Sequence, residues 1–519
     1  MKVHLVLICL TVFVHSMEAM VYSIRDYGAV GDGQTINTTA IQKTIDTCCR
    51  DGGGIVLIPA GTYMSGSLKL FSNVQLLLEH DAVLKGSANL QDYYLDGKLV
   101  GLLYCEDAEN IVISGTGTID GNGDVFFDLS KAKKIENAAT WYTRQKERFR
   151  EVPQGLGDGP VVPKSRPFQM IIFSNCKNVT VRDILITNSP FWTVHFADCD
   201  GVIVAGIRLW NNLLVPNGDG LDFTSCSNVL VSDCDIRAGD DAIAITGYDH
   251  HFDLPGYKYL RHDSENITVT NCTLLSRSSG IRIGGLDQNS MRNYTFSNIV
   301  IYNSNRGVGL FLRDAGSIED MTFTNMVIKT RLFSGDWWGN GEPIHLSAIR
   351  LTEKVILGHL RNIKFSHILA EGESGMILYG TAERGIENVT FTDVSFKIRD
   401  NVRNETYGGN FDLRPVLEPR FQLFAHDIPA IYAQYIKNLS IDGFDLNWDP
   451  VTAPFFTHGI EIDQFEQVYI NNFNGAPAPN NKNAAVIRLK NGQDFKILNS
   501  QTNRPGVQLL STENTTEKK

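Results

Sequence analysis

Three segments decide the fold of this 519-residue chain: NVTVRDILI at 178–186, GVIVAGIRL at 201–209 and NVLVSDCDI at 228–236. Each alternates apolar and polar residues over a short strand, crosses a polar break and enters a second strand. Where no insertion intervenes, the copies start 23 to 27 residues apart. This alternation, repeated at a fixed coil length, predicts an all-β fold, a right-handed parallel β-helix. Further copies start at Asn110, Asn266, Asn293, Asp320, Asn362, Asn388 and Asn438.

Two other repetitive or layered folds do not fit the pattern. Leucine-rich repeats need an LxxLxL motif with a helix or its equivalent in each copy. Doubly wound α/β folds need helices of about 10–15 residues between strands, and residues 168–330 leave no room for them.

The β-helix also explains recurrent Cys and Asn residues. Cys176, Cys199 and Cys226 each lie two residues before a repeat start, while Cys234 and Cys272 each lie six after one. Such positions stack on successive coils, either as buried thiols or as disulfides between neighbours. The repeated Asn predicts a second ladder at the turns, which accounts for most N-x-[ST] sequons without a glycan.

The N-terminal region predicts export and a cap. Residues 1–19 carry Lys2, an apolar run of about ten residues and then small residues, the pattern of a signal peptide. We therefore expect a secreted, extracellular protein, or a periplasmic one in a bacterium. Residues 38–50 predict a short amphipathic helix that covers the open end of the β-helix.

Composition excludes several kinds of partner. The formal net charge is -11, which argues against nucleic acid or an anionic membrane as a partner. No Cys or His pair has zinc-ligand spacing, and we expect no metal and no cofactor. We expect a monomer with one catalytic β-helix domain over 20–510, insertions at about 128–163 and 332–344, and a disordered tail at 511–519. The first insertion is charged and partly helical. Both insertions carry aromatic residues, for which two interpretations stay open: stacking on sugar rings, or packing of the loop onto the coil beneath.

Two acidic stretches on adjacent predicted coils suggest chemistry. NGDGLD at 217–222 holds Asp219, and GDDAIAI at 239–245 holds Asp240 and Asp241. Consecutive strand residues face opposite sides, so both of the latter reach one site only if the chain bends at Gly239. Crowded carboxylates cannot all ionise, which provides a general acid and a general base for glycoside hydrolysis. Solvated turn aspartates are the structural alternative.

The chain resembles glycoside hydrolase family 28, the polygalacturonases and related pectin hydrolases. The resemblance rests on DYGAVGDG at 26–33, GGGIVLIPAGTY at 52–63, GTGTIDGNG at 115–123, RPFQMIIF at 166–173, the two acidic stretches, and WWGNGEPI at 337–344. It implies inverting, metal-free hydrolysis of α-linked galacturonate backbones. It further implies that Asp240 is the general acid, that Asp219 and Asp241 hold and deprotonate water, and that Asn217 positions the site.

Two family motifs differ in this chain. Ser279 stands where the resemblance leads us to expect His, and Phe311 stands where it leads us to expect Arg. Arg313 occupies the family's Lys position, and Arg282 follows Ser279 by three residues. We interpret Ser279, Arg282 and Arg313 as substrate-binding residues, and Phe311 as making one subsite more tolerant of neutral sugars.

The predicted function is therefore a secreted inverting hydrolase of pectin backbones, of the polygalacturonase type. A hydrolase for rhamnogalacturonan or substituted pectin is the alternative in the same family. A β-helix uronate lyase or epimerase and a non-catalytic carbohydrate-binding solenoid are alternatives from other classes.

Overall fold

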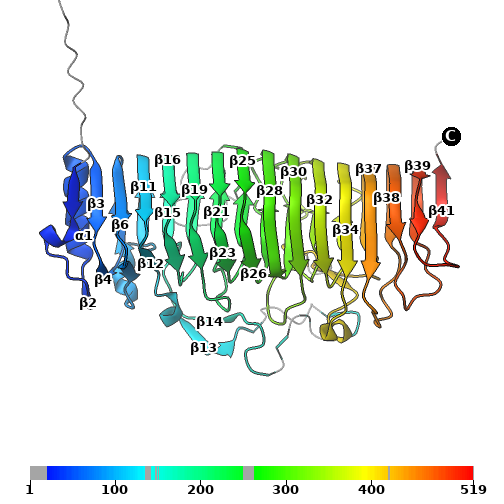
Figure 1. Cartoon of the computed structure of the whole chain (residues 1–519), viewed down its shortest axis with the longest axis horizontal. Coiled ribbons are helices and arrows are strands. Elements are labelled where there is room, and N and C mark those ends of the chain that lie inside the picture. Colours follow the sequence, from blue (N-terminus) through cyan, green and yellow to red (C-terminus); the bar gives the residue numbers. More distant parts are fainter. Residues whose placement is uncertain are drawn as a thin grey trace, which may run out of the picture.

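The computed structural model describes residues 20–134, 142–146, 149, 151–152, 154–248, 262–418 and 421–517. The predicted signal peptide, 1–19, lies outside these residues. The described strands form one 35-stranded, mainly parallel sheet that winds along the long axis of the molecule (Figure 1). The predicted parallel β-helix is therefore confirmed.

Each coil of the first half contributes strands to three parallel stacks. The first stack includes the strands that follow the two acidic stretches. It contains β5 Leu68–Leu70, β10 Leu103–Glu106, β15 Ile171–Ser174, β18 Val194–Ala197, β21 Leu221–Thr224, β24 Ile243–Thr246, β27 Ser279–Gly284, β29 Arg306–Leu312, β31 Ile344–Ala348 and β33 Met376–Tyr379. The second stack contains β1 Val21–Ser23, β3 Gly54–Ile58, β6 Val74–Leu78, β11 Glu109–Gly115, β16 Lys177–Arg182, β19 Asp200–Ala205, β22 Ser227–Ser232 and β25 Ser264–Thr270. The third contains β2 Asp32–Ile36, β4 Gly61–Ser65, β7 Ala82–Gly86, β12 Thr118–Asp120, β17 Leu185–Thr187, β20 Arg208–Trp210, β23 Asp235–Ala238 and β26 Thr273–Ser276.

Later coils join the second and third strands into longer ones. These are β28 Met291–Ser304, β30 Ile318–Thr330, β32 Leu360–Gly372 and β34 Ile386–Ile398. In β37 Ile431–Trp448, β38 Ile460–Gly475 and β39 Ile487–Leu498 the strand of the first stack is joined as well. The two-residue strand β40 Gln501–Thr502 pairs with β38, and β41 Leu510–Glu517 is the last strand. The last of them corrects one prediction. The segment expected to be a disordered tail is largely β41, which pairs in parallel with β39. Edge pairing gives its backbone hydrogen bonds that composition alone does not reveal.

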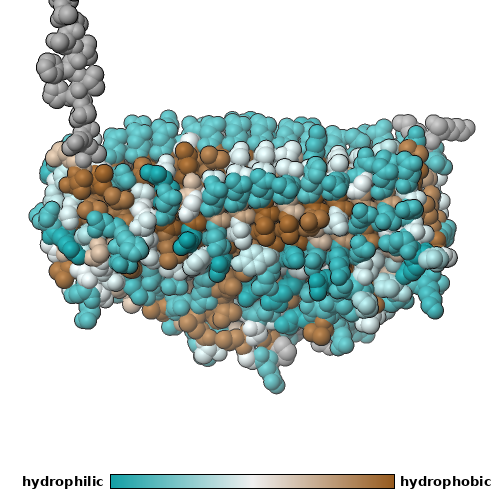
Figure 2. All heavy atoms as spheres, viewed as in Figure 1, coloured by the Kyte–Doolittle hydropathy of each residue, from teal (hydrophilic) through white to brown (hydrophobic). Residues whose placement is uncertain are grey.

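The alternation that predicts the strands also separates core from surface. In β19, Val202 and Val204 are fully buried, whereas Ile203 between them is 43% exposed. Burial of each such aliphatic side chain stabilises the folded state by about 1.5–3 kcal/mol relative to an exposed side chain. Aromatic residues stack in the same register, as Phe173 and Phe196 do with ring centroids 5.2 Å apart. The outer face is mostly polar, with an apolar band along the axis (Figure 2).

Both predicted ladders are present. Asn266 Nδ2 donates to Asn228 Oδ1 at 3.2 Å, and Asn293 Nδ2 donates to Asn266 Oδ1 at 3.3 Å. These residues turn the chain at φ values from +55° to +63°, a region that Asn tolerates better than most residues. All eight described cysteines are free, and the Cys105 and Cys176 sulfur atoms lie 3.8 Å apart. The thiol interpretation is therefore the one the structure supports.

The cap and the additions to the coils complete the molecule. The helix α1, Thr38–Arg50, has the predicted bounds and buries Ile41, Ile45 and Cys48 at the first coil. No helix among the described residues is long and apolar enough to cross a membrane. Small antiparallel pairs lie outside the large sheet, namely β8 Tyr94–Leu95 with β9 Lys98–Leu99, β13 Phe127–Ala132 with β14 Val161–Pro163, and β35 Asn410–Asp412 with β36 Leu423–Ala425.

The first insertion starts and ends as the β13–β14 pair rather than as helix. Residues 135–141, 147–148, 150 and 153 of this insertion lie outside the described residues, and the prediction of partial helix is not tested there. Single-turn 3-10 helices occur at η1 Ile24–Tyr27, η2 Leu90–Tyr93, η3 Gly123–Phe126 and η5 Val402–Glu405.

Candidate active site

Backbone pairing places Asp219, Asp241 and Ser279 at equivalent positions on three successive coils. Each residue lies at or just before the first residue of a strand in the first stack. Gly220 N donates to Asp241 O at 2.9 Å, and Ala242 N donates to Ser279 O at 2.9 Å. The three side chains therefore form a column across the coils.

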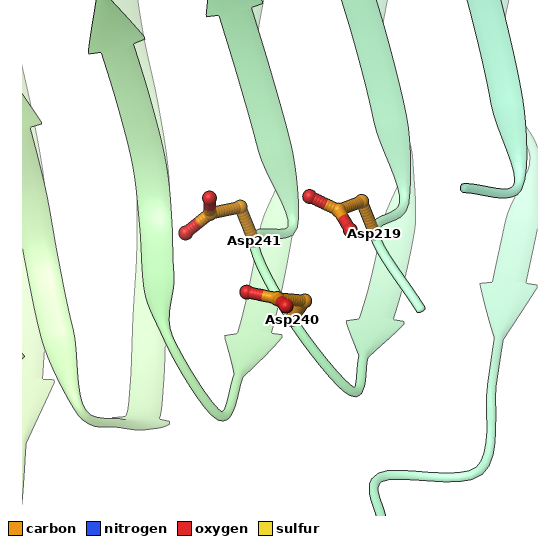
Figure 3. Close-up of side chains that lie close together, drawn as sticks. All are labelled: Asp219, Asp240 and Asp241. Atoms are coloured by element: carbon orange, nitrogen blue, oxygen red, sulfur yellow. The ribbon is translucent and has the colours of Figure 1, made fainter. Parts of the chain in front are cut away.

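Asp240 joins this column from the turn before β24. Each of the three carboxylates offers one oxygen that lies within 4.8 Å of those of the other two. Figure 3 shows Asp219 and Asp241 side by side, with Asp240 below and between them. Asp240 is half-buried, while Asp219 and Asp241 are 3% and 2% exposed. The predicted cluster of three aspartates is brought together.

The bend that this cluster requires occurs at Gly239. β23 ends at Ala238, and Gly239 N donates to Gly218 O at 3.1 Å before the chain turns into β24. A Cβ atom on Gly239 would lie 2.3 Å from Val215 O, a distance that no side chain tolerates. Glycine thus lets the turn pack closely enough for both Asp240 and Asp241 to face the site.

Predicted site residues hold two of the carboxylates in place. Asn217 N donates to Asp240 Oδ2 at 3.1 Å, with Asn217 at φ +55°. Ser279 N donates to Asp241 Oδ1 at 2.8 Å, and Arg282 Nη1 lies 3.6 Å from Asp241 Oδ2. Asn217, Ser279 and Arg282 therefore surround the cluster as expected, although Ser279 acts through its backbone.

Crowding and burial perturb the acidity of the cluster. Burial, followed by the charge of Asp241, raises the pKa of Asp240 to about 6. Burial also raises the pKa of Asp219 well above its ordinary value, and repulsion from Asp240 adds to this effect. Arg282 acts in the opposite direction on the pKa of both groups. The site therefore holds protons near neutral pH, as an acid catalyst requires.

A fourth carboxylate, Asp222, was missed by the sequence analysis. It is 4% exposed, burial raises its pKa well above the ordinary value, and Arg282 opposes that rise. Asp222 pairs in register with Ala244, which pairs with Arg282 on the next coil. The alternation in NGDGLD contained the signal, because Leu221 and Phe223 face the core and Asp222 must face outward.

Arg166 is a second residue that the sequence analysis quoted but did not assign to the site. Its guanidinium donates to the Asn217 side chain at 2.8 Å and to the carbonyls of Pro190 and Pro216. It lies over the Phe191 ring, 4.8 Å from the centroid. Burial lowers its pKa to about 10, and Asp219 and Asp240 oppose that change. Arg166 therefore places a cation beside two of the acids.

Arg313 and Phe311 correct the predicted substrate contacts. Arg313 is fully buried, and its guanidinium donates to backbone carbonyls of Leu312, Ser347, Leu413 and Pro415. Phe311 is also fully buried, with the Arg313 guanidinium 5.3 Å from its ring centroid. Residues 412–416 cover this part of the first stack. Arg313 anchors that cover instead of facing substrate, and Phe311 cannot line a subsite.

The two tryptophans of the second insertion have different environments. Trp337 is 1% exposed and donates its ring N–H to Asp158 O at 3.1 Å, which is a packing role. Trp338 is half-buried, and the Arg282 guanidinium lies 5.7 Å from its ring centroid. Of this pair, only Trp338 offers an accessible ring next to the carboxylates.

The three carboxylates are also the one group of acidic or imidazole side chains among the described residues whose spacing could hold a metal ion. Oxygen ligands suit Ca²⁺ or Mg²⁺. Arg282, however, already places positive charge against Asp241 at 3.6 Å. A cation would have to compete with that guanidinium, which disfavours the use of the cluster as a metal site.

A parallel β-helix that brings three carboxylates together on adjacent coils has groups suited to general acid–base chemistry. Residues 161–399, which contain the whole cluster, match the family model described as glycosyl hydrolases family 28. Residues 161–399 are thus similar to glycoside hydrolase family 28, the family that the sequence resembles.

Curated relatives match part of the chain, and solved structures share its fold. A probable polygalacturonase of Vitis vinifera is 28% identical over 255 residues, which is 46% of each chain. The chain thus spans about half the length of the curated relatives it matches. The fold matches a family 28 exopolygalacturonase of Yersinia enterocolitica at a TM-score of 0.62 and 17% identity, over 89% of this chain and 79% of that one. It also matches an exopolygalacturonase of Thermotoga maritima at 0.58 and 22% identity, over 73% and 87%.

Proposed function

We propose that the protein hydrolyses glycosidic bonds in the uronate-containing backbone of pectic polysaccharides. The observation that carries the proposal is the contact of Asp219, Asp240 and Asp241, whose oxygens lie within 4.8 Å of one another. A binding surface needs no such group, since burying three like charges costs free energy unless protons are retained.

In this proposal Asp240 is the general acid. Its pKa of about 6 keeps a proton available in mildly acidic solution, and it is the most accessible of the three carboxyls. Asp219 and Asp241, side by side on adjacent coils, hold the attacking water, and the member of this pair that is charged accepts its proton. Transfer of the Asp240 proton to the glycosidic oxygen breaks the bond, while water adds to the sugar carbon and gives up its proton.

The stereochemical course is part of the same proposal. Inverting enzymes usually keep their two carboxyls about 6.5–9.5 Å apart so that water fits between them. The oxygens of this cluster lie closer together than that, so the proposal of inversion rests on the resemblance to family 28 and not on the spacing. We therefore propose inversion at an α-linkage, and NMR of the first-formed reducing end decides it, since retention would give the opposite anomer.

The electrostatics favour an acidic substrate only locally. With a formal net charge of -11, the whole molecule repels a polyuronate. Arg282, beside Asp241 and Trp338, supplies a cation where a substrate carboxylate can bind. We further propose that the protein is exported, as the pattern of residues 1–19 suggests, and that it acts as a monomer.

The test is a panel of purified homogalacturonan, rhamnogalacturonan and xylogalacturonan oligosaccharides with product analysis. We expect new reducing ends without ultraviolet absorbance, because hydrolysis leaves no double bond. Asp240→Asn lowers turnover by about 10²–10⁴-fold, whereas Asp26→Asn, at an exposed residue of η1, leaves it unchanged. Unsaturated products that need added calcium would instead establish a lyase. Full activity in a folded Asp240→Asn protein would remove Asp240 from the acid role.

A further inference from the structure

The loop 336–339 of the second insertion brings an aromatic ring to the carboxylates. Trp338 N donates to Ser278 Oγ at 3.3 Å, in the turn that precedes β27. The Trp338 ring centroid lies 5.7 Å from the Arg282 guanidinium, and Arg282 Nη1 lies 3.6 Å from Asp241 Oδ2. The position of this loop therefore decides where an accessible aromatic ring lies relative to the carboxylates.

The local sequence does not fix the shape of this loop. Residues 331–343 contain no helix or strand. Gly335 and Gly339 lie on either side of the two tryptophans, with φ values of +87° and +107°. Such values suit glycine, which also has the most backbone freedom to lose on folding. Contacts from elsewhere in the chain must therefore hold the loop in place.

Arg414 holds the loop on the N-terminal side of Trp338. Its Nη1 donates to Asp336 Oδ1 at 2.9 Å, and its Nη2 donates to the Trp337 carbonyl oxygen at 2.8 Å. Burial acts to lower the pKa of Arg414, but the charges of Asp412 and Asp336 outweigh it and raise that pKa above its ordinary value. Arg414 therefore remains charged, and both hydrogen bonds to the loop are charge-assisted.

Asp412 holds the loop on the C-terminal side of Trp338. Its Oδ2 accepts a hydrogen bond from Gly339 N at 3.0 Å. Asp412 also binds Arg414 through both oxygens, because Arg414 Nε donates to Oδ1 at 2.9 Å and Nη2 donates to Oδ2 at 2.9 Å. Both side chains are buried, at 5% exposure for Arg414 and 0% for Asp412. This bidentate pairing fixes the relative orientation of the two side chains, so the loop is held on both sides of Trp338.

Other contacts hold the hairpin of β35 and β36 to the coils without the Arg414 side chain. Arg306 Nη2 donates to Asp412 O at 3.1 Å. Arg313 Nη2 donates to Leu413 O at 2.9 Å. Loss of the Arg414 guanidinium should therefore release the loop of the second insertion and leave the hairpin on its coils.

We propose that Arg414 is a positioning residue, which holds Trp338 beside Arg282 as a fixed platform for a sugar ring of the substrate. This inference rests on the proposed function and adds to it a residue that acts through Trp338 and not on the substrate itself. A ring that is held in place before binding loses less conformational freedom when a sugar packs on it. The platform should therefore act on substrate binding and not on the proton transfers at the carboxylates.

The test is a double-mutant cycle of Arg414→Gln and Trp338→Ala on an oligogalacturonate that the parent protein cleaves. We expect Arg414→Gln to raise KM about 10-fold, within the range of coupling between residues in contact, and to leave kcat within about twofold. In the Trp338→Ala background the same change should raise KM by no more than about twofold, because the ring that Arg414 positions is absent. Arg414→Lys keeps the charge without the planar fork, so its KM should lie between those of the parent and Arg414→Gln.

Two controls accompany the cycle. Arg182→Gln, at a side chain that is 54% exposed in the second stack, should change neither KM nor kcat. Urea unfolding of every variant measures stability separately, since a purely structural role for Arg414 would lower the midpoint and raise KM equally with and without Trp338. Calorimetric binding of the oligogalacturonate in an Asp240→Asn background repeats the cycle without turnover.

The outcomes separate this inference from the proposed function. A parent protein that cleaves no pectic oligosaccharide would refute the function and the inference together. The inference alone is refuted by an active parent in which Arg414→Gln and Trp338→Ala act additively on KM, or in which Arg414→Gln lowers kcat instead of raising KM. If Arg414→Gln does not fold, Asp336→Ala decides by the same cycle, since it removes one contact of Arg414 with the loop at a side chain that is 14% exposed.

Discussion

Replacing Asp240 by Asn should stabilise the folded protein at neutral and alkaline pH while abolishing catalysis. The amide keeps the shape of the carboxyl and can still accept the hydrogen bond from Asn217 N. It removes the charge that burial and Asp241 oppose. The site would thus gain stability through the change that removes its acid.

The size and sign of the effect follow from the pKa of Asp240. Its folded value is about 6 against an ordinary value of 3.8, so between these values the folded state holds a proton that the unfolded chain has lost. The free energy of unfolding therefore falls as pH rises through this window. A difference of about two units corresponds to about 3 kcal/mol, reduced because Asp240 is half-buried and partly screened.

The assay is urea unfolding of parent and variant at about pH 3.5, 5 and 8. We expect similar midpoints at the lowest pH and a higher midpoint for Asp240→Asn at pH 8. Asp26→Asn, at an exposed carboxyl, serves as the matched control and should show no such divergence. A variant that is less stable than the parent at pH 8, or shifted equally at all three values, would refute the account of Asp240 as a strained, proton-retaining acid.

Three further predictions concern the surroundings of the cluster. Arg282 lowers the pKa of Asp240 and Asp219, so Arg282→Gln should move the alkaline limb of the pH–rate profile upward; an unmoved limb would contradict this coupling. Trp338→Ala should raise KM and leave thermal stability unchanged. Trp337→Ala, at a 1% exposed core position, should lower the free energy of unfolding by about 3–5 kcal/mol. The reverse pair of effects would contradict the assignment of Trp338 to the site and Trp337 to the core. The eight described cysteines are free and only Cys49 is not fully buried, so a thiol reagent should label the native protein weakly and all eight after unfolding; fewer would indicate disulfides.

The fold was predictable because each coil of a β-helix has a similar length, so the coils appear in the sequence as a repeat. Each coil must place apolar residues inward at alternate positions and turn at a residue that tolerates positive φ. The repeats that begin with Asn therefore predicted both the strands, from their alternation, and the turns, from the Asn position. The α1 bounds were equally readable, because Gly52 and Gly53 follow the helix at φ of +100° and +109°. The tail was not, since its pairing with β39 depends on a neighbour and not on local composition.

The site was only partly predictable, for a related reason. Asp219, Asp240 and Asp241 come from stacked coils, so their contact follows from the repeat length. Arg313 fits the same register, but its guanidinium donates hydrogen bonds to Leu413 and Pro415, in a loop that covers that coil. The covering loop lies about a hundred residues away in the chain, a separation that no repeat encodes.

The spacing between neighbouring coils links the repeating fold to the chemistry of the site. Neighbouring parallel strands lie about 4.8 Å apart, so a residue type repeated at one position always meets its own kind. Repeated Asn residues form hydrogen-bonded ladders and repeated Phe residues form stacked rings, and both stabilise the fold. Repeated Asp residues do not, because like charges repel. Burial raises the pKa of Asp219 and Asp240, and repulsion between carboxylates on adjacent coils adds to that rise. The fold creates an acid where it places carboxylates on adjacent coils, and the arginines around them limit how strongly the proton is held.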